Sequence, residues 1–320
     1  PWMPYHEFLT QYSAEIVGAL EKEVVVMNSL SVNLNLLMTS FYQPHGKKKK
    51  ILMEHNAFPS DRYAVQSQLK LHGNHPIDDL IILTPDDGAN ITTNGILDYF
   101  DRHGEEIAMV LIGGVNYYTG QAFNMKAITN KAHEHNCLVG FDLAHATGNT
   151  GLKLHDWGVD FAAWCGYKYL NGGPGAPSGV FIHEGHLGKT DIPRFEGWWG
   201  HDKSTRFEMP DEFIPIDTAE AWQLSNPPIL AMAPLLASLE IFHEAGMENL
   251  IKKSHQLTQF LENLILTELG AKIEIITPTN SDDRGCQLSL RLVNLMPNIM
   301  DKLHDVGIIA DWREPDVIRI

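Results

Sequence analysis

The feature that most constrains this chain is a lysine that closes one apolar run, together with an aspartate that closes an earlier one. Lys168 follows the mainly apolar segment 159–164 and precedes the glycine-rich turn 171–175. Asp142 ends the apolar segment 137–141. Both runs have the length of buried strands and are bounded by turn residues. Because parallel strands end at one edge of a sheet, the two polar side chains are expected to lie close together.

The surrounding pattern predicts an α/β fold with a mainly parallel sheet. Short strand-like runs and longer helix-like runs alternate, with strands expected at 23–27, 50–55, 107–112, 138–141 and 161–164 and helices at 32–41 and 125–136. Such alternation is typical of a parallel sheet covered by helices on both faces. Binding sites in these sheets lie beyond the carboxyl ends of the strands, where Asp142, Lys168 and the turn Asn28–Ser31 are expected.

The pattern changes after Pro228. An amphipathic helix is expected at 229–244 and a second helix at 247–269, with Gly246 between them. Strands at 273–276 and 286–292, a helix at 298–306 and a closing strand pair follow. We therefore expect a large domain, 1–228, and a smaller α+β domain, 229–320, joined by the long helix.

Composition excludes several classes of protein. The 24 basic and 40 acidic residues give a net charge of −16, which argues against nucleic acid or an anionic membrane as a partner. No apolar stretch approaches the roughly 20 residues of a membrane span, and no signal peptide opens the chain. Cys137, Cys165 and Cys286 lie in apolar contexts and are expected to be buried thiols of a cytoplasmic protein. The first residue is not methionine and the last, Ile320, falls in a strand-like run, so we expect residues to be missing at both ends.

An aspartate and a lysine at neighbouring strand ends suit pyridoxal phosphate (PLP). The lysine amine would form the Schiff base, and the carboxylate would keep the pyridine nitrogen protonated so that the ring accepts electrons. A lone lysine beside glycines is more typical of a surface loop. The pairing of Lys168 with Asp142 favours the cofactor site.

Other residues at this edge have two interpretations each. Ser31 opens a helix, which suits either phosphate binding or an ordinary N-cap. In the segment Phe58–Asp61, the aromatic ring could stack on a pyridine or act as a hydrophobic staple beside a cap. His145 could brace Asp142, face the cofactor or simply be packed. The phenol of Tyr167 could bind phosphate or transfer protons.

The segment His133–His135 superficially resembles a metal motif. Residues i and i+2 of a helix point in different directions, so these two histidines are not expected to share a metal ion. No metal site is predicted.

With these residues assembled, the chain resembles the kynureninase family, PLP enzymes of fold type I. Ten segments carry the resemblance: 1–2, 26–34, 58–61, 118–121, 140–146, 155–161, 167–171, 197–201, 225–228 and 284–288. The Trp-Gly-His and Ser-Asn-Pro-Pro sequences among them are far more specific than the aspartate-to-lysine spacing, which marks only the superfamily.

The resemblance implies a role for each matching residue. Lys168 would form the Schiff base, Asp142 would pair with the pyridinium beside His145, and Tyr167 would contact the phosphate, the substrate and the transferred proton. The remaining expected positions are Leu30, Ser31, Phe58, Pro59, Ser60 and Asp61 for the cofactor, Trp198 and Asn226 supplied by the partner subunit of a homodimer, with Asn226 also contacting substrate, and Arg319 for the substrate carboxylate. Two departures stand out: Ser31 replaces a frequent threonine, and Gly113 stands where some relatives have a cofactor-contacting serine.

The implied reaction is hydrolysis of the Cβ–Cγ bond of L-kynurenine or 3-hydroxykynurenine, giving L-alanine and anthranilate or 3-hydroxyanthranilate. This would place the chain in tryptophan catabolism by the kynurenine pathway and in NAD biosynthesis. The alternatives are another fold-type-I enzyme, such as a cysteine desulfurase or a class V aminotransferase, and a PLP-fold module that binds without catalysis. A desulfurase needs a mobile reactive cysteine, whereas Cys165 and Cys286 are expected in strands. The intact set of Lys168, Asp142 and Tyr167 argues against a module without catalysis.

Overall fold

The molecule is built around a seven-stranded sheet. The computed structural model describes residues 2–85, 88–294 and 298–320, so Pro1, which opens the first resembling segment, lies outside the described residues. The strand order is β1-β7-β6-β5-β4-β2-β3. The strands are β1 (Val24–Met27), β2 (Lys50–Glu54), β3 (Leu80–Leu83), β4 (Ile107–Gly113), β5 (Leu138–Asp142), β6 (Phe161–Cys165) and β7 (Ser178–Ile182).

The sheet is mainly parallel, as the alternation of elements predicts. Strands β3, β2, β4, β5 and β6 pair in parallel, whereas β7 runs antiparallel to both of its neighbours, β6 and β1. The central strands β5 and β6 are buried almost throughout, which explains their near-continuous apolar sequences. The strands β3 and β7 have no counterpart among the sequence expectations.

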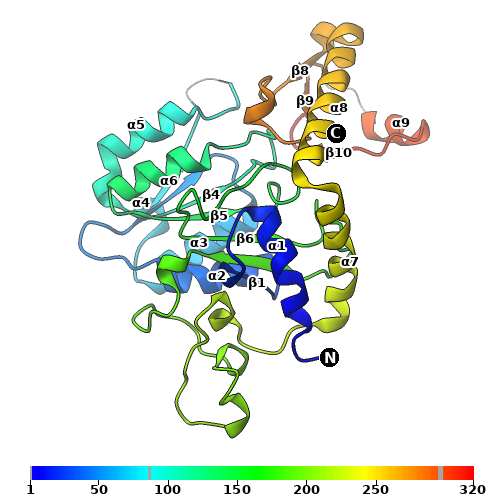
Figure 1. Ribbon diagram of the computed structural model, residues 1–320. Coiled ribbons are helices and arrows are strands. Elements are labelled where there is room, and N and C mark those ends of the chain that lie inside the picture. Colours follow the sequence, from blue (N-terminus) through cyan, green and yellow to red (C-terminus); the bar gives the residue numbers. More distant parts are fainter. Residues whose placement is uncertain (1, 86–87, 295–297) are drawn as a thin grey trace.

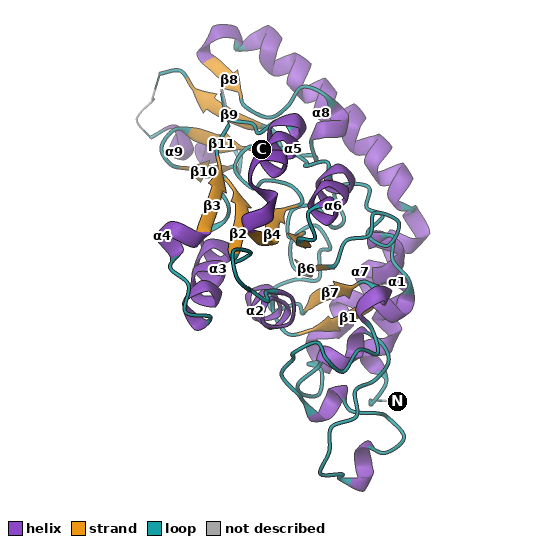
Figure 2. Cartoon of the chain, turned by 90° about the vertical axis from the view of Figure 1, so that its left-hand side faces the viewer, coloured by secondary structure: helices purple, strands orange, loops and turns teal. Residues whose placement is uncertain are grey.

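Helices cover both faces of this sheet (Figures 1 and 2). One apolar layer contains α1, α5, α6 and α7, and the layer on the opposite face contains α2 and α3. The bounds are α1 (Thr10–Val17), α2 (Leu30–Phe41), α3 (Pro59–Leu71), α4 (Pro76–Asp79), α5 (Thr93–His103), α6 (Met125–Glu134) and α7 (Ile229–Ala245). The large sheet is therefore shielded on both sides, and ligands reach it at its edges.

A second, four-stranded antiparallel sheet follows α7 in the chain. Its order is β10-β11-β9-β8, and it lies beside α8 (Figure 2). The bounds are α8 (Met247–Glu268), β8 (Ile273–Ile275), β9 (Ser289–Leu292), α9 (Ile299–Asp305), β10 (Asp311–Arg313) and β11 (Val317–Arg319). These elements match the expected order, although β9 is shorter than the apolar run 286–292.

The chain bends sharply where α7 meets α8. Gly246 separates the helices with a φ of 75°, which is costly for other residues, and the two axes are bent by 82°. In the described part of the chain no single helix is long and apolar enough to cross a membrane. Among the helices of the described residues, α7 and α8 taken together have the length and apolar composition of a membrane span, but they form this bent pair.

Two expectations from the sequence are wrong in detail. The helix α7 is apolar on more than one side, since Leu230 and Ile241 are exposed while Leu235 is buried, so it is not amphipathic. Cys286 is exposed and precedes β9, so it is neither a buried thiol nor carried by a strand. Both expectations failed because a residue with apolar neighbours in the sequence is buried only where another helix or strand covers it.

Candidate active site

A cavity of about 380 Å³ opens at the carboxyl ends of the parallel strands. The lining residues come from the turns after five strands, from the start of α2 and from the hairpin β10–β11. They are Ser29, Leu30, Ser31, Glu54, Phe58, Ser60, Asp61, Gly113, Val115, Tyr117, Asp142, Ala144, His145, Tyr167, Lys168, Arg313 and Arg319. Most residues predicted from the sequence are therefore brought together in one place.

Lys168 and Asp142 meet because their strands are neighbours. Asp142 ends β5 and pairs in register with Ala163 of β6, and Lys168 follows β6 in the next turn. The amine nitrogen of Lys168 lies 3.0 Å from Nε2 of His145 and 5.7 Å from the centre of the Phe58 ring. The amine therefore lies near an imidazole and an aromatic ring that line the same cavity.

Asp142 shares its buried position with a second carboxyl group, that of Asp61. Both side chains are almost fully buried, and an Asp142 oxygen accepts a 2.7 Å hydrogen bond from the Ala144 amide. Burial raises the pKa of Asp61 well above its usual range, and the neighbouring charge and hydrogen bond of Asp142 raise it further. Burial raises the pKa of Asp142 as well, but the hydrogen bonds from Asp61 and the Ala144 amide oppose that rise, so we place the proton of the pair on Asp61 and its single negative charge on Asp142.

Glu54 is a third buried carboxyl group that the sequence analysis missed. Its Oε1 accepts a 3.1 Å hydrogen bond from the Gly113 amide, and its Oε2 has no partner among the described residues. Burial, and to a lesser extent Asp142, raises its pKa to about 7. A side chain at Gly113 would place its Cβ only 3.0 Å from this Oε1, so glycine makes room for the carboxyl group. A strand-end glutamate within an apolar run was the signal that could have identified it.

Replacing Glu54 by glutamine is expected to stabilise the cofactor-free protein at alkaline pH. A carboxyl group whose pKa rises from 4.5 to about 7 on folding favours the folded state at low pH. This advantage disappears as pH rises through that interval, and the difference amounts to about 3 kcal/mol. Melting temperatures of wild type and Glu54→Gln at pH 5 and pH 8 test this: the variant should gain most at pH 8. An equal effect at both values would contradict the raised pKa.

His145 lines the same cavity as Phe58. Burial lowers its pKa to about 3, helped by the positive charges of Lys168, Arg319 and Arg313, so the imidazole is neutral. Its Nδ1 is buried and has no partner among the described residues. A neutral imidazole suits packing against an aromatic ligand better than pairing with an anion.

The start of α2 provides the anion-binding end of the cavity. The helix begins at Leu30 rather than at Ser31, so Ser31 lies in the first turn and Ser29 is the N-cap residue, whose side chain makes no capping hydrogen bond. The first amides of the helix lack partners within it and can bind a phosphate. Tyr167 is half exposed, and burial raises the pKa of its phenol. The phenol therefore stays protonated at neutral pH and can donate a proton.

Two arginines reach the cavity from the hairpin β10–β11. Arg319 was expected there, whereas Arg313 was missed because its segment gave no motif beyond a closing strand. Their guanidinium groups lie 5.8 Å and 5.7 Å from the ring centre of Tyr117, which contacts Phe58 edge to face. The substrate side of the cavity is thus positively charged and bounded by aromatic rings.

The residues present fit PLP. Lys168 offers an amine, the Asp142–Asp61 pair a negative charge, α2 a phosphate site and Phe58 with His145 two flat walls. Glu54 and His145, which line this cavity, each have a buried polar atom without a partner among the described residues, which is unfavourable without a polar ligand. The cavity volume lies in the range of small-molecule sites.

Trp198 and Asn226 do not line this cavity among the described residues. Trp198 is half exposed beside a different hollow, where its Nε1 donates to the carbonyl of Arg206, and Asn226 lies exposed next to Ser225. In a single chain these two predicted residues are therefore not part of the site.

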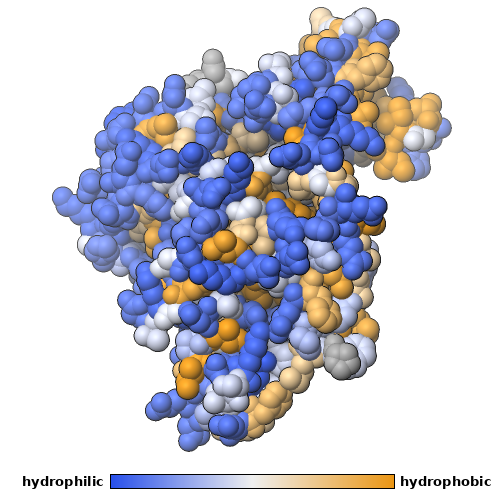
Figure 3. Space-filling model, viewed as in Figure 1, coloured by the Kyte–Doolittle hydropathy of each residue, from blue (hydrophilic) through white to orange (hydrophobic). Residues whose placement is uncertain are grey.

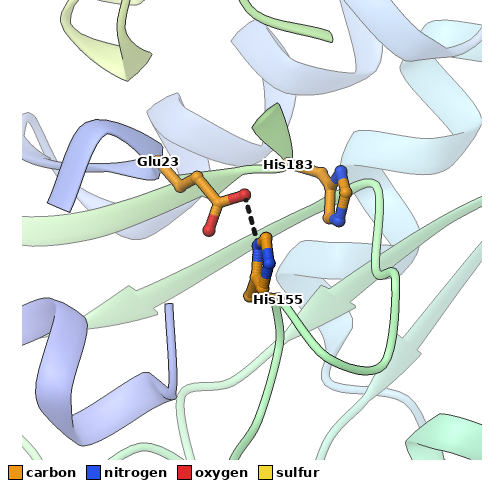
Figure 4. A group of neighbouring side chains, drawn as sticks. All are labelled: Glu23, His155 and His183. Carbon is orange, nitrogen blue, oxygen red and sulfur yellow. Dashed lines mark hydrogen bonds and ion pairs between the residues drawn. The ribbon is translucent and has the colours of Figure 1, made fainter. Parts of the chain in front are cut away.

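Two clusters with metal-ligand side chains lie elsewhere, and both are already occupied by protein donors. In the first (Figure 4), Oε1 of buried Glu23 contacts His155 at 2.9 Å and accepts the Glu184 amide, while His183 stacks on His155. The other oxygen of Glu23, Oε2, accepts a hydrogen bond from the Leu20 amide. In the second cluster, the ammonium group of Lys203 contacts Glu7 and Glu220, and His6 contacts Glu220. Both arrangements tie segments together. His133 and His135 have different partners, since His133 pairs with Asp160 and His135 lies 4.0 Å from Asp101.

Comparison with solved structures places the fold among PLP-dependent proteins of fold type I. A cysteine desulfurase from Thermococcus onnurineus superposes with a TM-score of 0.80 at 18% identity, covering 98% of this chain and 78% of that one. An alanine–glyoxylate aminotransferase from Nostoc sp. gives 0.70 at 12% identity, with 99% and 80% covered. A variant of C-DES with glycine covalently linked to its PLP cofactor gives 0.80 at 19% identity, with 98% and 80% covered. These likenesses confirm the predicted fold class.

Sequence comparison is more specific. A family model described as the kynureninase C-terminal domain matches residues 250–320. Kynureninases of Koribacter versatilis and Myxococcus xanthus are each 53% identical to this chain over its full length, which spans 76% and 75% of those proteins. Identity of this level along the whole chain shows that it belongs to the kynureninase family.

Proposed function

We propose that this chain hydrolyses the Cβ–Cγ bond of L-kynurenine, or of its 3-hydroxy form, to L-alanine and anthranilate or 3-hydroxyanthranilate. The chain is a PLP-dependent enzyme of the kynureninase family. The observation that carries the proposal is Arg319, which lies in one cavity with Lys168 and Asp142 and would bind the carboxylate of an amino-acid substrate. The choice of kynurenine among amino acids is supported by the kynureninases that are 53% identical to this chain.

The proposed mechanism assigns each proton to a residue of the cavity. When bound, PLP supplies an electron sink for the charge that develops at Cα. Asp142 would keep the ring nitrogen protonated, and the Lys168 amine would take the Cα proton and return it to Cα before alanine leaves. Tyr167 would assist the addition of water to the γ-carbonyl, donate its phenol proton to Cβ as the Cβ–Cγ bond breaks, and regain a proton from the water-derived hydroxyl group on Cγ. Arg319 holds the carboxylate, which orients the bond to be broken.

We assign the cofactor contacts to the residues named from the sequence. Leu30 and Ser31 would bind the phosphate with Tyr167, and the segment Phe58–Asp61, which includes Pro59 and Ser60, would contact the ring together with Asp142 and His145. Support comes from their shared cavity, where only Pro59 is absent from the lining residues described above.

We further propose a cytoplasmic homodimer with shared active sites. Exposed apolar side chains gather along α7 and around α8 and α9 (Figure 3), including Leu230, Ile241 and Phe260. Trp198 and Asn226 lie outside the cavity of their own chain, as residues donated to a partner would. We also propose that residues 1–228 and 229–320 form two domains, each with its own sheet, joined by α7, which begins the second domain and packs against the large sheet.

Product analysis tests the reaction. The PLP-loaded protein is mixed with L-kynurenine, and anthranilate fluorescence is followed together with alanine. Equal release of both is the expected result. If PLP binds and neither product appears, the substrate assignment is wrong. Sulfide from L-cysteine would then indicate a desulfurase, for which the exposed Cys286 makes a test necessary.

Replacing Arg319 by alanine is expected to raise KM for L-kynurenine by roughly 10- to 150-fold, because a charged hydrogen bond contributes about 1.5–3 kcal/mol. Arg319→Lys keeps the positive charge but loses the paired N–H donors of the guanidinium group, so a KM between those of wild type and Arg319→Ala is expected. An unchanged KM in Arg319→Ala would remove this residue from the site.

A further inference from the structure

We propose that Asp311 is a positioning residue, which fixes the guanidinium group of Arg319 so that its free N–H donors can bind a single carboxylate. The inference deepens the proposed function and rests on it. Nothing in the sequence pattern singled out Asp311, which lines a second cavity of about 530 Å³ together with Lys168 and Arg319.

The hairpin places the two side chains opposite each other. Asp311 of β10 and Arg319 of β11 are directly paired in the antiparallel register, so their side chains stand on one face of the sheet. The Oδ2 atom of Asp311 accepts a 2.6 Å hydrogen bond from Nε of Arg319 and also contacts Nη2. On the other side of the guanidinium group, Nη1 donates a 2.7 Å hydrogen bond to the carbonyl of Tyr117.

The number of donors shows what remains for a ligand. A guanidinium group has five N–H donors. Asp311 engages the side bearing Nε and Nη2, and the Tyr117 carbonyl engages one donor of Nη1. One N–H is left on each terminal nitrogen, which is the number that a two-pronged contact with a carboxylate needs. Since Arg319 lines the cavity and its side chain is only 13% exposed, these donors are held in place before a ligand arrives.

Arg313 completes the arrangement. Its Nε lies 2.9 Å from the same Oδ2 atom, so Asp311 is held by two guanidinium groups. The three side chains carry one net positive charge, which matches one carboxylate. In a competing interpretation, the Asp311 carboxylate occupies the position on Arg319 that the substrate carboxylate would take, and it would have to be displaced for substrate to bind. The two interpretations predict opposite effects when Asp311 is removed.

The test uses the full, PLP-loaded chain and two small ligands. L-Alanine carries the carboxylate and L-alaninamide does not, and the absorbance change of the bound cofactor reports binding of each. In Asp311→Ala we expect the Kd for alanine and the KM for L-kynurenine to rise roughly tenfold, the scale of one lost charged hydrogen bond. The kcat and the Kd for alaninamide should stay within about twofold, as for lost ground-state positioning. Asp311→Asn keeps an acceptor oxygen and should recover part of the affinity.

Control variants separate the possible failures. Asp316→Asn removes another carboxylate of the same hairpin, one that pairs with Arg291, and should leave alanine binding unchanged. A tighter or unchanged Kd for alanine in Asp311→Ala, or an equal loss for alaninamide, would overturn the positioning role. If Arg319→Ala weakens alanine binding while Asp311→Ala does not, only this inference fails. If neither does, the carboxylate site of the proposed function fails as well.

Discussion

Lys168→Ala is expected to abolish the covalent attachment of PLP and to lower turnover of L-kynurenine by at least about 10³-fold. The variant loses the amine that bonds to the cofactor and the base that removes the Cα proton, and proton transfer by a positioned base alone contributes roughly 10²- to 10⁴-fold. The amine is also the group that His145 contacts at 3.0 Å. Steady-state kinetics and the absorbance of denatured, borohydride-reduced protein measure the two losses separately.

Lys70→Ala is the matched control, because Lys70 is an exposed lysine of α3 outside the cavity. It should bind PLP and turn over substrate as wild type does. A Lys168→Ala protein with normal turnover would refute the assignment of the Schiff-base lysine. Folding can be compared by circular dichroism, since Lys168 is not part of the buried apolar core.

Asp142→Asn is expected to lower kcat by about 10²- to 10³-fold, the scale on which loss of one fixed electrostatic contact affects catalysis. Asparagine keeps the size of the side chain and an oxygen for the Ala144 amide, but it removes the charge that would hold the ring nitrogen protonated. The pKa of Asp61 should fall in the same variant, because the charge of Asp142 is one of the causes that raise it. Kinetics give the first effect, and carboxyl carbon NMR of labelled protein gives the second.

Asp156→Asn serves as the control, because Asp156 is an exposed aspartate between β5 and β6. If Asp142→Asn retained the wild-type kcat, the pairing with the ring nitrogen would have to move to Asp61. An unchanged pKa of Asp61 would contradict the contact between the two carboxyl groups.

Asp142 and Lys168 could be predicted from the sequence because they lie at or just after the end of a strand. Asp142 and Lys168 follow apolar runs that could only be buried strands, and a parallel sheet brings strand ends together. The family resemblance supplied the remaining roles. The strands β3 and β7 were missed, and the start of α2 was placed too late. Ser31 looked like a cap, whereas the helix continues back to Leu30.

The residues missed in the site depend on contacts between distant segments. Glu54 gives no motif, and its character comes from burial beside Gly113 and Asp142. Asp311 and Arg313 acquire a role only when the hairpin β10–β11 packs against the loop after β4. Such packing depends on tertiary structure that periodicity along one chain does not encode.

The loop after β4 has a consequence for the mutational tolerance of the enzyme. Asn116 accepts hydrogen bonds from the Tyr118 and Thr119 amides and so sets the turn. Main-chain carbonyls of this turn then bind residues of the smaller sheet and its flanks. The Tyr118 carbonyl accepts a hydrogen bond from the Ser289 hydroxyl, and the Thr119 carbonyl accepts one from the Thr277 hydroxyl, each at 2.6 Å. Every amino acid supplies a carbonyl group, so on this side the attachment of the small sheet depends on the backbone conformation of the turn. The hydrogen bond at Tyr118 therefore does not depend on which side chain this position carries, whereas the turn that presents both carbonyls depends on the side chain of Asn116.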